Sequence, residues 1–152
     1  MSARARTNQL LYQARLLLAM PVGEDEHADA RRMALEESAL AQLELALASL
    51  IEEIAHICNW PDMEWRQALL DPPRSVAEIE RLRALREDGS SWLARLLWHI
   101  DRLHGEEGAA MRQRPSMTIT TTGRAGLADD LHDALAGFAT LLPALRETGV
   151  EW

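Results

Sequence analysis

Three pairs of an acid and a histidine separated by two residues form the pattern in this sequence that most resembles a chemical site. They are Glu53 and His56, Asp101 and His104, and Asp129 and His132. Di-iron carboxylate bundles use a Glu-x-x-His pair from each of two helices, with all ligands projecting inward. At about 100° per residue, however, His56 lies roughly 130° from the apolar side of its predicted helix. We therefore expect no metal or other cofactor, and Glu53, His56 and His104 are kept only as a minor metal-site alternative.

A second candidate site centres on Glu36, which stands seven residues before Leu43 on an apolar helical seam. In a tight hairpin of the first two helices, the numbers of facing residues add up to about 45. This register predicts a polar layer within the bundle that consists of Arg6, Asn8, Gln9 and Glu36. A buried carboxylate needs a charged or hydrogen-bonding partner. The layer is therefore either a structural cluster that fixes the helix register or a pocket for a small ligand.

Tryptophan is the third unusual feature, because the chain has five of them against one tyrosine and one phenylalanine. Trp60 and Trp65 flank a proline break, and Trp98 lies about 140° from Leu93 around its predicted helix. Exposed tryptophan is enriched where protein partners dock. We therefore expect Trp60, Trp65 and Trp98 at an interface. The alternative for Trp98 is packing beneath a loop at 105–124.

These side chains must be positioned by helices, because apolar residues recur at intervals of three and four along most of the chain. The strongest prediction is a helix over 25–58, which contains no proline or glycine. Its apolar residues follow a heptad seam. The seam residues are Met33, Leu40, Leu43, Leu47, Leu50, Ile54 and Ile57.

Further helices are predicted from apolar spacing and from their start and stop signals. A first helix spans 3–20 and ends before Pro21, and a short helix starts at Pro61 and runs to about residue 70. Ser75 and Glu78 form a capping box for a helix that ends at 89. The remaining helices span 91–104, capped by Ser90 or Ser91, and 127–147. The fold class is all-α, an antiparallel bundle of four principal helices plus one or two short ones.

A long loop at about 105–124 interrupts this pattern. The whole chain is expected to be one domain over 1–152 that includes this loop. The connection contains the run Met117 to Thr122, which alternates faintly and has strand propensity. It is either an ordinary mobile loop or an extended segment laid on a partner. The length of the chain is sufficient for a single core.

The charge distribution excludes a general nucleic-acid binder. The chain has 16 basic and 24 acidic residues and a net charge of −8, and it contains no lysine. Residues 1–23 carry three arginines and no acid, whereas 24–56 are strongly acidic, which predicts antiparallel docking of the first two helices. Attachment of the first helix to a membrane surface is disfavoured because its apolar side is needed in the bundle. No apolar run is long enough for a transmembrane helix.

Enzyme motifs are absent from the sequence. A helical ribonuclease of the higher-eukaryote and prokaryote nucleotide-binding type has arginine and histidine separated by four to six residues, whereas Arg95 and His99 are separated by three. There is no phosphate-binding loop, nucleophile elbow or paired-cysteine zinc pattern. The single Cys58 cannot form an intrachain disulfide and is expected beside the core, so a reducing compartment fits best.

Several short segments together carry a resemblance to a known family. They are Arg6-Thr7-Asn8-Gln9, Glu36 with Ser38-Ala39-Leu40, Glu53-Ile54-Ala55 before Trp60-Pro61, and Trp92-Leu93-Ala94. Over about the first 100 residues the chain resembles a domain-of-unknown-function family of small helical proteins from Gram-negative bacteria. This resemblance implies a bacterial, cytoplasmic protein and no particular reaction.

The function predicted from the sequence is a non-enzymatic protein-interaction or structural module in the cytoplasm. Its expected partner is a second copy of the chain or another protein, with no nucleic acid and no membrane. The alternative is a bundle that binds a small ligand or a metal through a polar core layer. Glu36, Glu53 and nearby histidines would form that layer.

Overall fold

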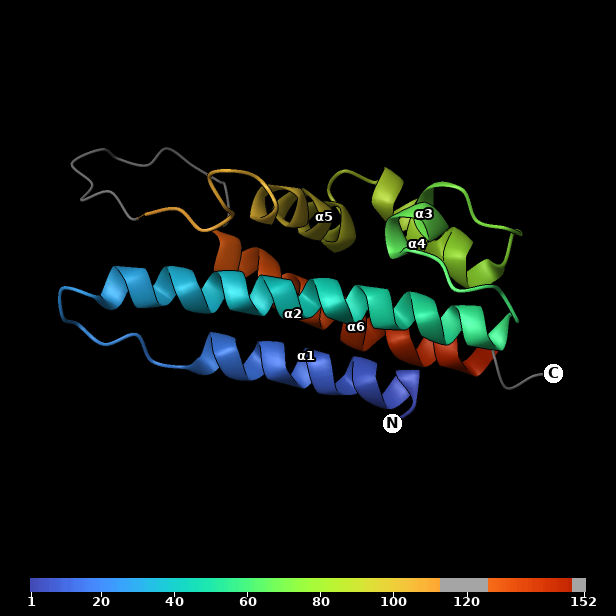
Figure 1. Cartoon of the computed structure of the whole chain (residues 1–152), viewed down its shortest axis with the longest axis horizontal. Helices are drawn as coiled ribbons and strands as arrows, with labels where there is room; N and C mark the ends of the chain where they lie inside the picture. Colours follow the sequence, from blue (N-terminus) through green and yellow to red (C-terminus); the bar gives the residue numbers. More distant parts are fainter. Residues whose placement is uncertain (113–125, 149–152) are drawn as a thin grey trace.

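A computed structural model describes residues 1–112 and 126–148, and every regular element in these two ranges is an α-helix (Figure 1). The all-α class predicted from the sequence is thus confirmed. The helices are α1 (Ala3–Ala19), α2 (Ala28–Ile57), α3 (Trp65–Leu70), α4 (Ala77–Glu87), α5 (Trp92–Leu103) and α6 (Leu127–Thr148). None of these described helices is long and apolar enough to cross a membrane.

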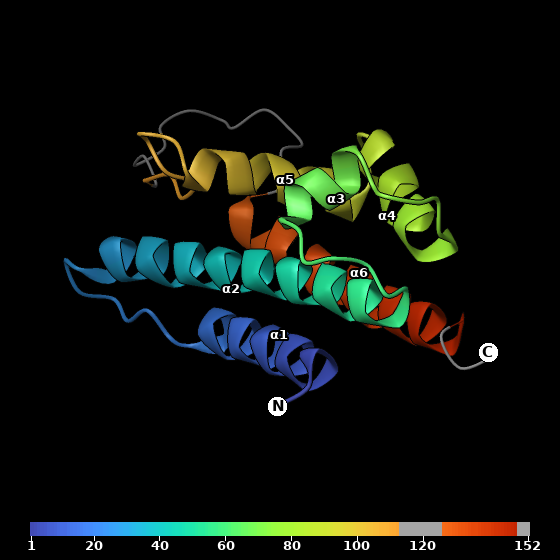
Figure 2. The same cartoon turned by 45° about the vertical axis from the view of Figure 1, so that its right-hand side comes forward.

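The helices are arranged in three layers, with α2 and α6 in the middle (Figures 1 and 2). Helix α1 packs on one side of this middle layer, and α3, α4 and α5 lie on the other side. Helix α1 runs antiparallel to α2, as the opposite charges of their segments predict. Helix α6 follows α2 in the same direction, so α2 and α6 together form a shared wall for both outer layers.

Helix α2 carries the seam that its heptad pattern predicts, since Leu40, Leu43, Leu47, Leu50 and Ile54 are all buried. At about 1.5 Å per residue, its 30 residues span roughly 45 Å.

The last seam residue departs from this pattern: Ile57 is 55% exposed rather than buried. It ends α2, and the chain turns away at once through Asn59, whose φ of 55° is left-handed. Trp60 N–H then donates to the Ala55 carbonyl at 2.8 Å, the long-range bond of a helix C-cap. This cap folds Trp60 back onto the core and leaves Ile57 outside.

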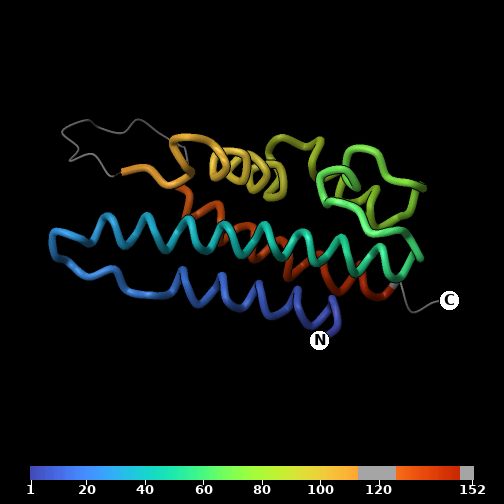
Figure 3. The backbone as a smooth tube through the Cα atoms, in the orientation of Figure 1, coloured from blue at the N-terminus to red at the C-terminus, as the bar shows by residue number. Residues whose placement is uncertain are grey.

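The register of α1 against α2 differs from the predicted one. The Thr7 hydroxyl donates to Ser49 Oγ at 2.8 Å, and Ser49 donates to the Ala3 carbonyl at 3.0 Å, both in the buried interface. The prediction assumed a tight turn at 21–24, which would have set Thr7 opposite a residue about eleven positions earlier on α2. Instead residues 20–27 run on past the end of α1 before the chain turns back (Figure 3), so α2 overhangs α1 by its first turns.

Two predicted helix starts are also corrected. Ser75 does not cap α4, because the N-cap residue is Val76 and it makes no side-chain cap bond. With the helix starting one residue later than predicted, Glu78 is no longer at the third position that a capping box requires. Helix α3 starts at Trp65 instead of Pro61, and the Glu64 carboxylate caps it through Gln67 N–H. The prediction that Ser91 could cap α5 is confirmed, because Ser91 Oγ accepts from Ala94 N–H at 3.1 Å.

The described start of the long connection is attached to α2. The Glu37 carboxylate accepts from Ala109 N–H at 2.8 Å and from Ala110 N–H at 3.1 Å. Gly108 beside them has a φ of +72°, and a Cβ there would overlap the Glu37 carboxylate. The position therefore requires glycine. The run Met117 to Thr122 lies outside the described residues.

Close contact between α5 and α6 depends on a second glycine. The indole ring of Trp92 lies against the α6 backbone at Gly137, where a Cβ would overlap the base of the ring. The same ring packs on buried Phe138, with 4.9 Å between centroids and a tilt of 53°. Gly137 therefore allows α5 to approach α6 through a large aromatic side chain.

We predict that Gly137→Ala lowers the free energy of unfolding by about 1–3 kcal/mol, the range for overpacked cores. The added methyl displaces the base of the Trp92 ring, which cannot swing away as a flexible chain end would. This cost outweighs the gain of about 1 kcal/mol that alanine brings inside a helix. Urea unfolding measures the difference.

Gly89→Ala is the matched control, because nothing lies within 4 Å of a Cβ at that position. Its effect should stay within about 0.5 kcal/mol. Equal stability of the Gly137→Ala variant and the wild-type chain would contradict the proposed role of Gly137.

Candidate functional site

The residues predicted to form one polar layer lie in three separate places. Arg6 donates to Gln9 within α1 at 2.6 Å. Asn8 accepts from Arg146 of α6 at 3.0 Å. Glu36 is buried and pairs with Arg32 of its own helix. The predicted layer is therefore not assembled, because it depended on the hairpin register that the Thr7 and Ser49 contact replaces.

Glu36 belongs to a cluster at the start of α2. Arg32 binds both Glu36 and Asp29, at 2.8 Å for Asp29, and donates to the Met111 carbonyl at 2.6 Å. The guanidinium thus compensates a buried carboxylate and also holds the connection after α5 against α2. The Glu36 carboxylate is therefore compensated by Arg32 of its own helix and not by a residue of α1.

Asn8 and Glu53, both named as candidates from the sequence, meet at a second cluster that joins three helices. Arg146 of α6 donates from Nε to Glu53 Oε1 at 3.1 Å and from Nη2 to Glu53 Oε2 at 3.3 Å. Its Nη2 also reaches Asn8 Oδ1 of α1. Glu53 is almost fully buried, so this bidentate pair supplies the cation that its carboxylate requires.

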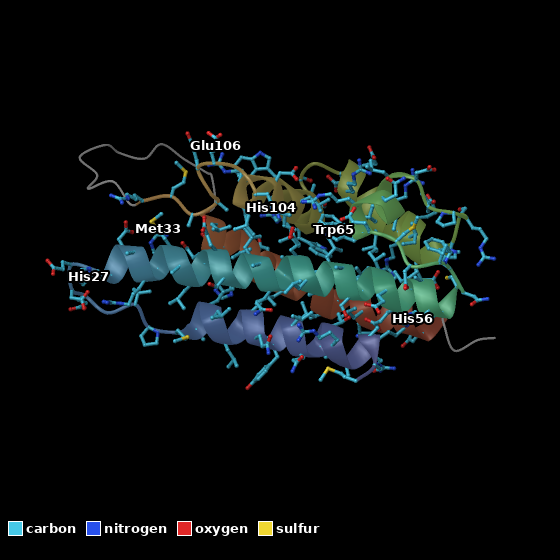
Figure 4. The ribbon with its side chains drawn as sticks, viewed as in Figure 1. His27, Met33, His56, Trp65, His104 and Glu106 are labelled. Atoms are coloured by element: carbon cyan, nitrogen blue, oxygen red, sulfur yellow. The ribbon has the colours of Figure 1, made fainter. Side chains whose placement is uncertain are left out.

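The metal candidates are not brought together. Glu53 is bound to Arg146, and His56 is exposed near the end of α2, 3.8 Å from Glu52. His104 lies well away from His56 (Figure 4), and its Nε2 contacts the Glu44 carboxylate at 2.8 Å. Within residues 1–112 and 126–148 no three ligating side chains are grouped as a metal would need.

Of the three tryptophans expected at an interface, two are buried in the chain's own core. Trp60 and Trp65 pack into the hydrophobic core, and Arg66 lies over the Trp65 ring at 4.4 Å. The interface expectation for Trp60 and Trp65 is therefore corrected: the left-handed turn at Asn59 directs the chain back over α2. Trp98 is 49% exposed, as its angle from Leu93 predicts, and Arg102 lies over its ring at 4.8 Å.

A partly buried charge cluster between α5 and α6 was not predicted from the sequence. Arg95 Nη1 binds Asp130 at 2.6 Å and Asp133 at 3.0 Å, and His99 Nε2 lies 2.7 Å from Asp130. His99 and Asp130 are both buried. The signal was present as Arg95 and His99 one turn apart, facing two aspartates three apart on another helix.

Arg95 supplies a permanent positive charge to this cluster. The hydrogen bond to Asp133, together with the charge of Asp130, raises the pKa of Arg95 above its ordinary value. Asp130 therefore faces a permanent cation, and its other carboxylate oxygen lies within hydrogen-bond distance of His99 Nε2. On the other side of the imidazole ring, His99 Nδ1 is buried and has no hydrogen-bond partner among the described residues.

Cys58 lies beside the core, as expected, and is half-buried. Burial, followed by the charge of Glu78, raises the pKa of its thiol. The thiolate is the reactive form of cysteine. The raised pKa therefore gives no support to a catalytic thiol.

The outward side of α1 carries an apolar stripe that was not predicted from the sequence. Tyr12, Leu16 and Met20 are spaced four residues apart and are 57%, 48% and 53% exposed. They lie opposite the side through which Thr7, Leu10 and Ala14 face the interior. We call Tyr12, Leu16 and Met20 the α1 stripe.

Comparison with known proteins adds a family and no activity. A family model described as "Family of unknown function (DUF6586)" matches residues 1–152. The match extends the resemblance seen over about the first 100 residues to the whole chain. No curated protein and no solved structure matches the chain.

We predict that Arg146→Met lowers the free energy of unfolding by about 3–5 kcal/mol, because it leaves the Glu53 carboxylate buried without a cation. Replacing both partners, Glu53→Met with Arg146→Met, should recover most of that loss, since the uncompensated charge is then gone. Chemical denaturation of the three proteins measures these differences.

Arg83→Met is the control, because the only ion pair that Arg83 forms within residues 1–112 and 126–148 is with Glu80 on the surface of α4. Its loss should stay at or below about 1 kcal/mol. If Arg146→Met and Arg83→Met destabilised the chain equally, Arg146 would not compensate a buried charge.

Proposed function

The chain belongs to this family of unknown function, and from that premise we propose that it is a non-enzymatic protein-interaction module that forms a homodimer through the α1 stripe. The observation that carries the proposal is the exposure of Tyr12, Leu16 and Met20 along one side of α1. We further propose a cytoplasmic location. It is supported by the single half-buried cysteine, which has no partner for a disulfide within the chain.

The stripe has no role in the internal packing of α1, since the opposite side of the helix meets α2. Burial of apolar surface contributes about 25 cal/mol per Å². Tyrosine and methionine are enriched in protein interfaces. Three large side chains in line along an outer layer therefore favour docking of a protein surface over simple exposure to water.

Charge and symmetry favour a second copy as the occupant. Two α1 helices that cross antiparallel at Leu16 place Tyr12 opposite Met20 of the second copy, in the two-fold arrangement commonest among homo-oligomers. Because the chain runs on past α1 in the same direction (Figure 3), the crossing also directs the N-terminal end of one α1, which carries Arg6, toward residues 20–27 of the second copy, the segment that contains Glu26. Arg6 and Glu26 are both exposed and of opposite charge.

The alternative function, a small-ligand or metal site in the polar core, has less support. Glu36 and Glu53 each hold an arginine already. A ligand at either carboxylate would have to displace that cation.

We predict that the wild-type chain sediments as a dimer and that Leu16→Glu sediments as a monomer with unchanged helicity. The substitution places a charge at the centre of the stripe without touching the core. Leu70→Glu is the control, because Leu70 on α3 is 56% exposed and lies outside α1. A monomeric wild-type chain at high concentration, or a dimeric Leu16→Glu variant, would contradict the proposal.

The proposed ionic contact can be tested by charge exchange. Arg6→Glu should weaken the dimer, and Arg6→Glu combined with Glu26→Arg should restore it, because each arginine then again faces an acid.

Trp98→Ala tests whether Trp98, the third tryptophan expected at an interface, takes part in dimerisation. Trp98 lies on α5, across the middle layer from α1 (Figure 2), so a role in dimerisation would require a second surface.

A further inference from the structure

A groove between α4, α5 and α6 has the size and lining of a small-molecule site. Its volume is about 550 Å³, within the range of roughly 300–1,000 Å³ typical of ligand pockets. Its apolar lining includes Leu85, Trp92 and Leu141, and Arg81 and Asp133 are among its polar residues. The groove is remote from the α1 stripe, because α1 lies on the other side of the middle layer.

The aromatic side chain that lines the groove is held in place by its packing. Trp92 is fixed from two sides, by the α6 backbone at Gly137 and by the ring of Phe138. An aromatic side chain held in this way presents a preformed surface, so a ligand would not have to order it on binding. The surface suits an aromatic or aliphatic body.

The charge of the groove comes from its arginines. Arg95 also lines the groove, but its positive charge is compensated by ion pairs with Asp130 and Asp133. The negative charge of Asp133 is compensated by the same ion pair. Arg81 is exposed and forms no ion pair with any residue in the described ranges. One uncompensated cation therefore lies beside a fixed apolar surface, in a protein whose net charge is −8.

We infer that this groove binds a small organic anion with an apolar body, such as an aromatic carboxylate or sulfonate. The acid group pairs with the Arg81 guanidinium, whose planar donors fit carboxylate and sulfonate oxygens. The apolar body lies on Trp92 between Leu85 and Leu141. The inference does not depend on the proposed dimer.

The test uses two probes that share their rings and differ in charge. Anilinonaphthalenesulfonate carries a sulfonate, and N-phenylnaphthylamine has the same rings without it. Fluorescence titration should show one tight anilinonaphthalenesulfonate site per chain and weaker binding of the neutral probe. The Trp92 indole N–H and the Gly137 amide should shift in a proton–nitrogen NMR spectrum when the anion is added.

Arg81→Met and Arg83→Met form the matched pair of variants, because each removes one positive charge from α4 and only Arg81 lines the groove. Arg81→Met should weaken anion binding about tenfold, the factor that one charge-assisted hydrogen bond supplies. Arg83→Met should change it less than about twofold, and neither variant should affect the neutral probe. Equal losses in the two variants, or equal affinity of the two probes for the wild-type chain, would overturn the inference.

Discussion

The buried carboxylate of Glu53 is the constraint on which the alignment of three helices depends. A charge removed from water needs a cation within hydrogen-bond reach, and Arg146 meets both of its oxygens. Arg146 reaches Asn8 with the same guanidinium, so one side chain links α1, α2 and α6. Sliding any of these helices by one turn, about 5.4 Å, would break the contact. The hydroxyl pair of Thr7 and Ser49 fixes the same register one turn away.

Local signals along the chain predicted the helices well and their mutual register badly. Helix α1 ends within one residue of its predicted end, and the buried leucines of α2 follow the heptad seam, because helix formation and amphipathicity depend on near neighbours. Whether Glu36 lies opposite Asn8 depends instead on the length of the connection over 20–27. A few residues there shift every facing pair, and the sequence carries no local signal for how tightly such a connection turns.

The predictions for the functional candidates were correct where a helical angle decides the position of a side chain, and wrong where the tertiary arrangement decides it. Trp98 could be placed on the surface by its angle around α5 alone. Trp60 could not, because its burial follows from the left-handed cap at Asn59, a change of chain direction that helical angles do not contain. The partners of Arg95 lie on α6, after a long connection, so their identity required the tertiary arrangement. The sequence by itself shows only the spacing of Arg95 and His99.

The distribution of paired and unpaired charges separates structural from recognition residues in this chain. Glu36, Glu53 and Asp130 are buried, and each is compensated by an arginine. Such a pair gains little by exchanging its partner for a ligand, since the desolvation cost is already offset. Arg81 instead lies at a surface beside fixed apolar side chains. A new partner there gains charge pairing and apolar burial together, so recognition is expected at this kind of position and not at the polar core.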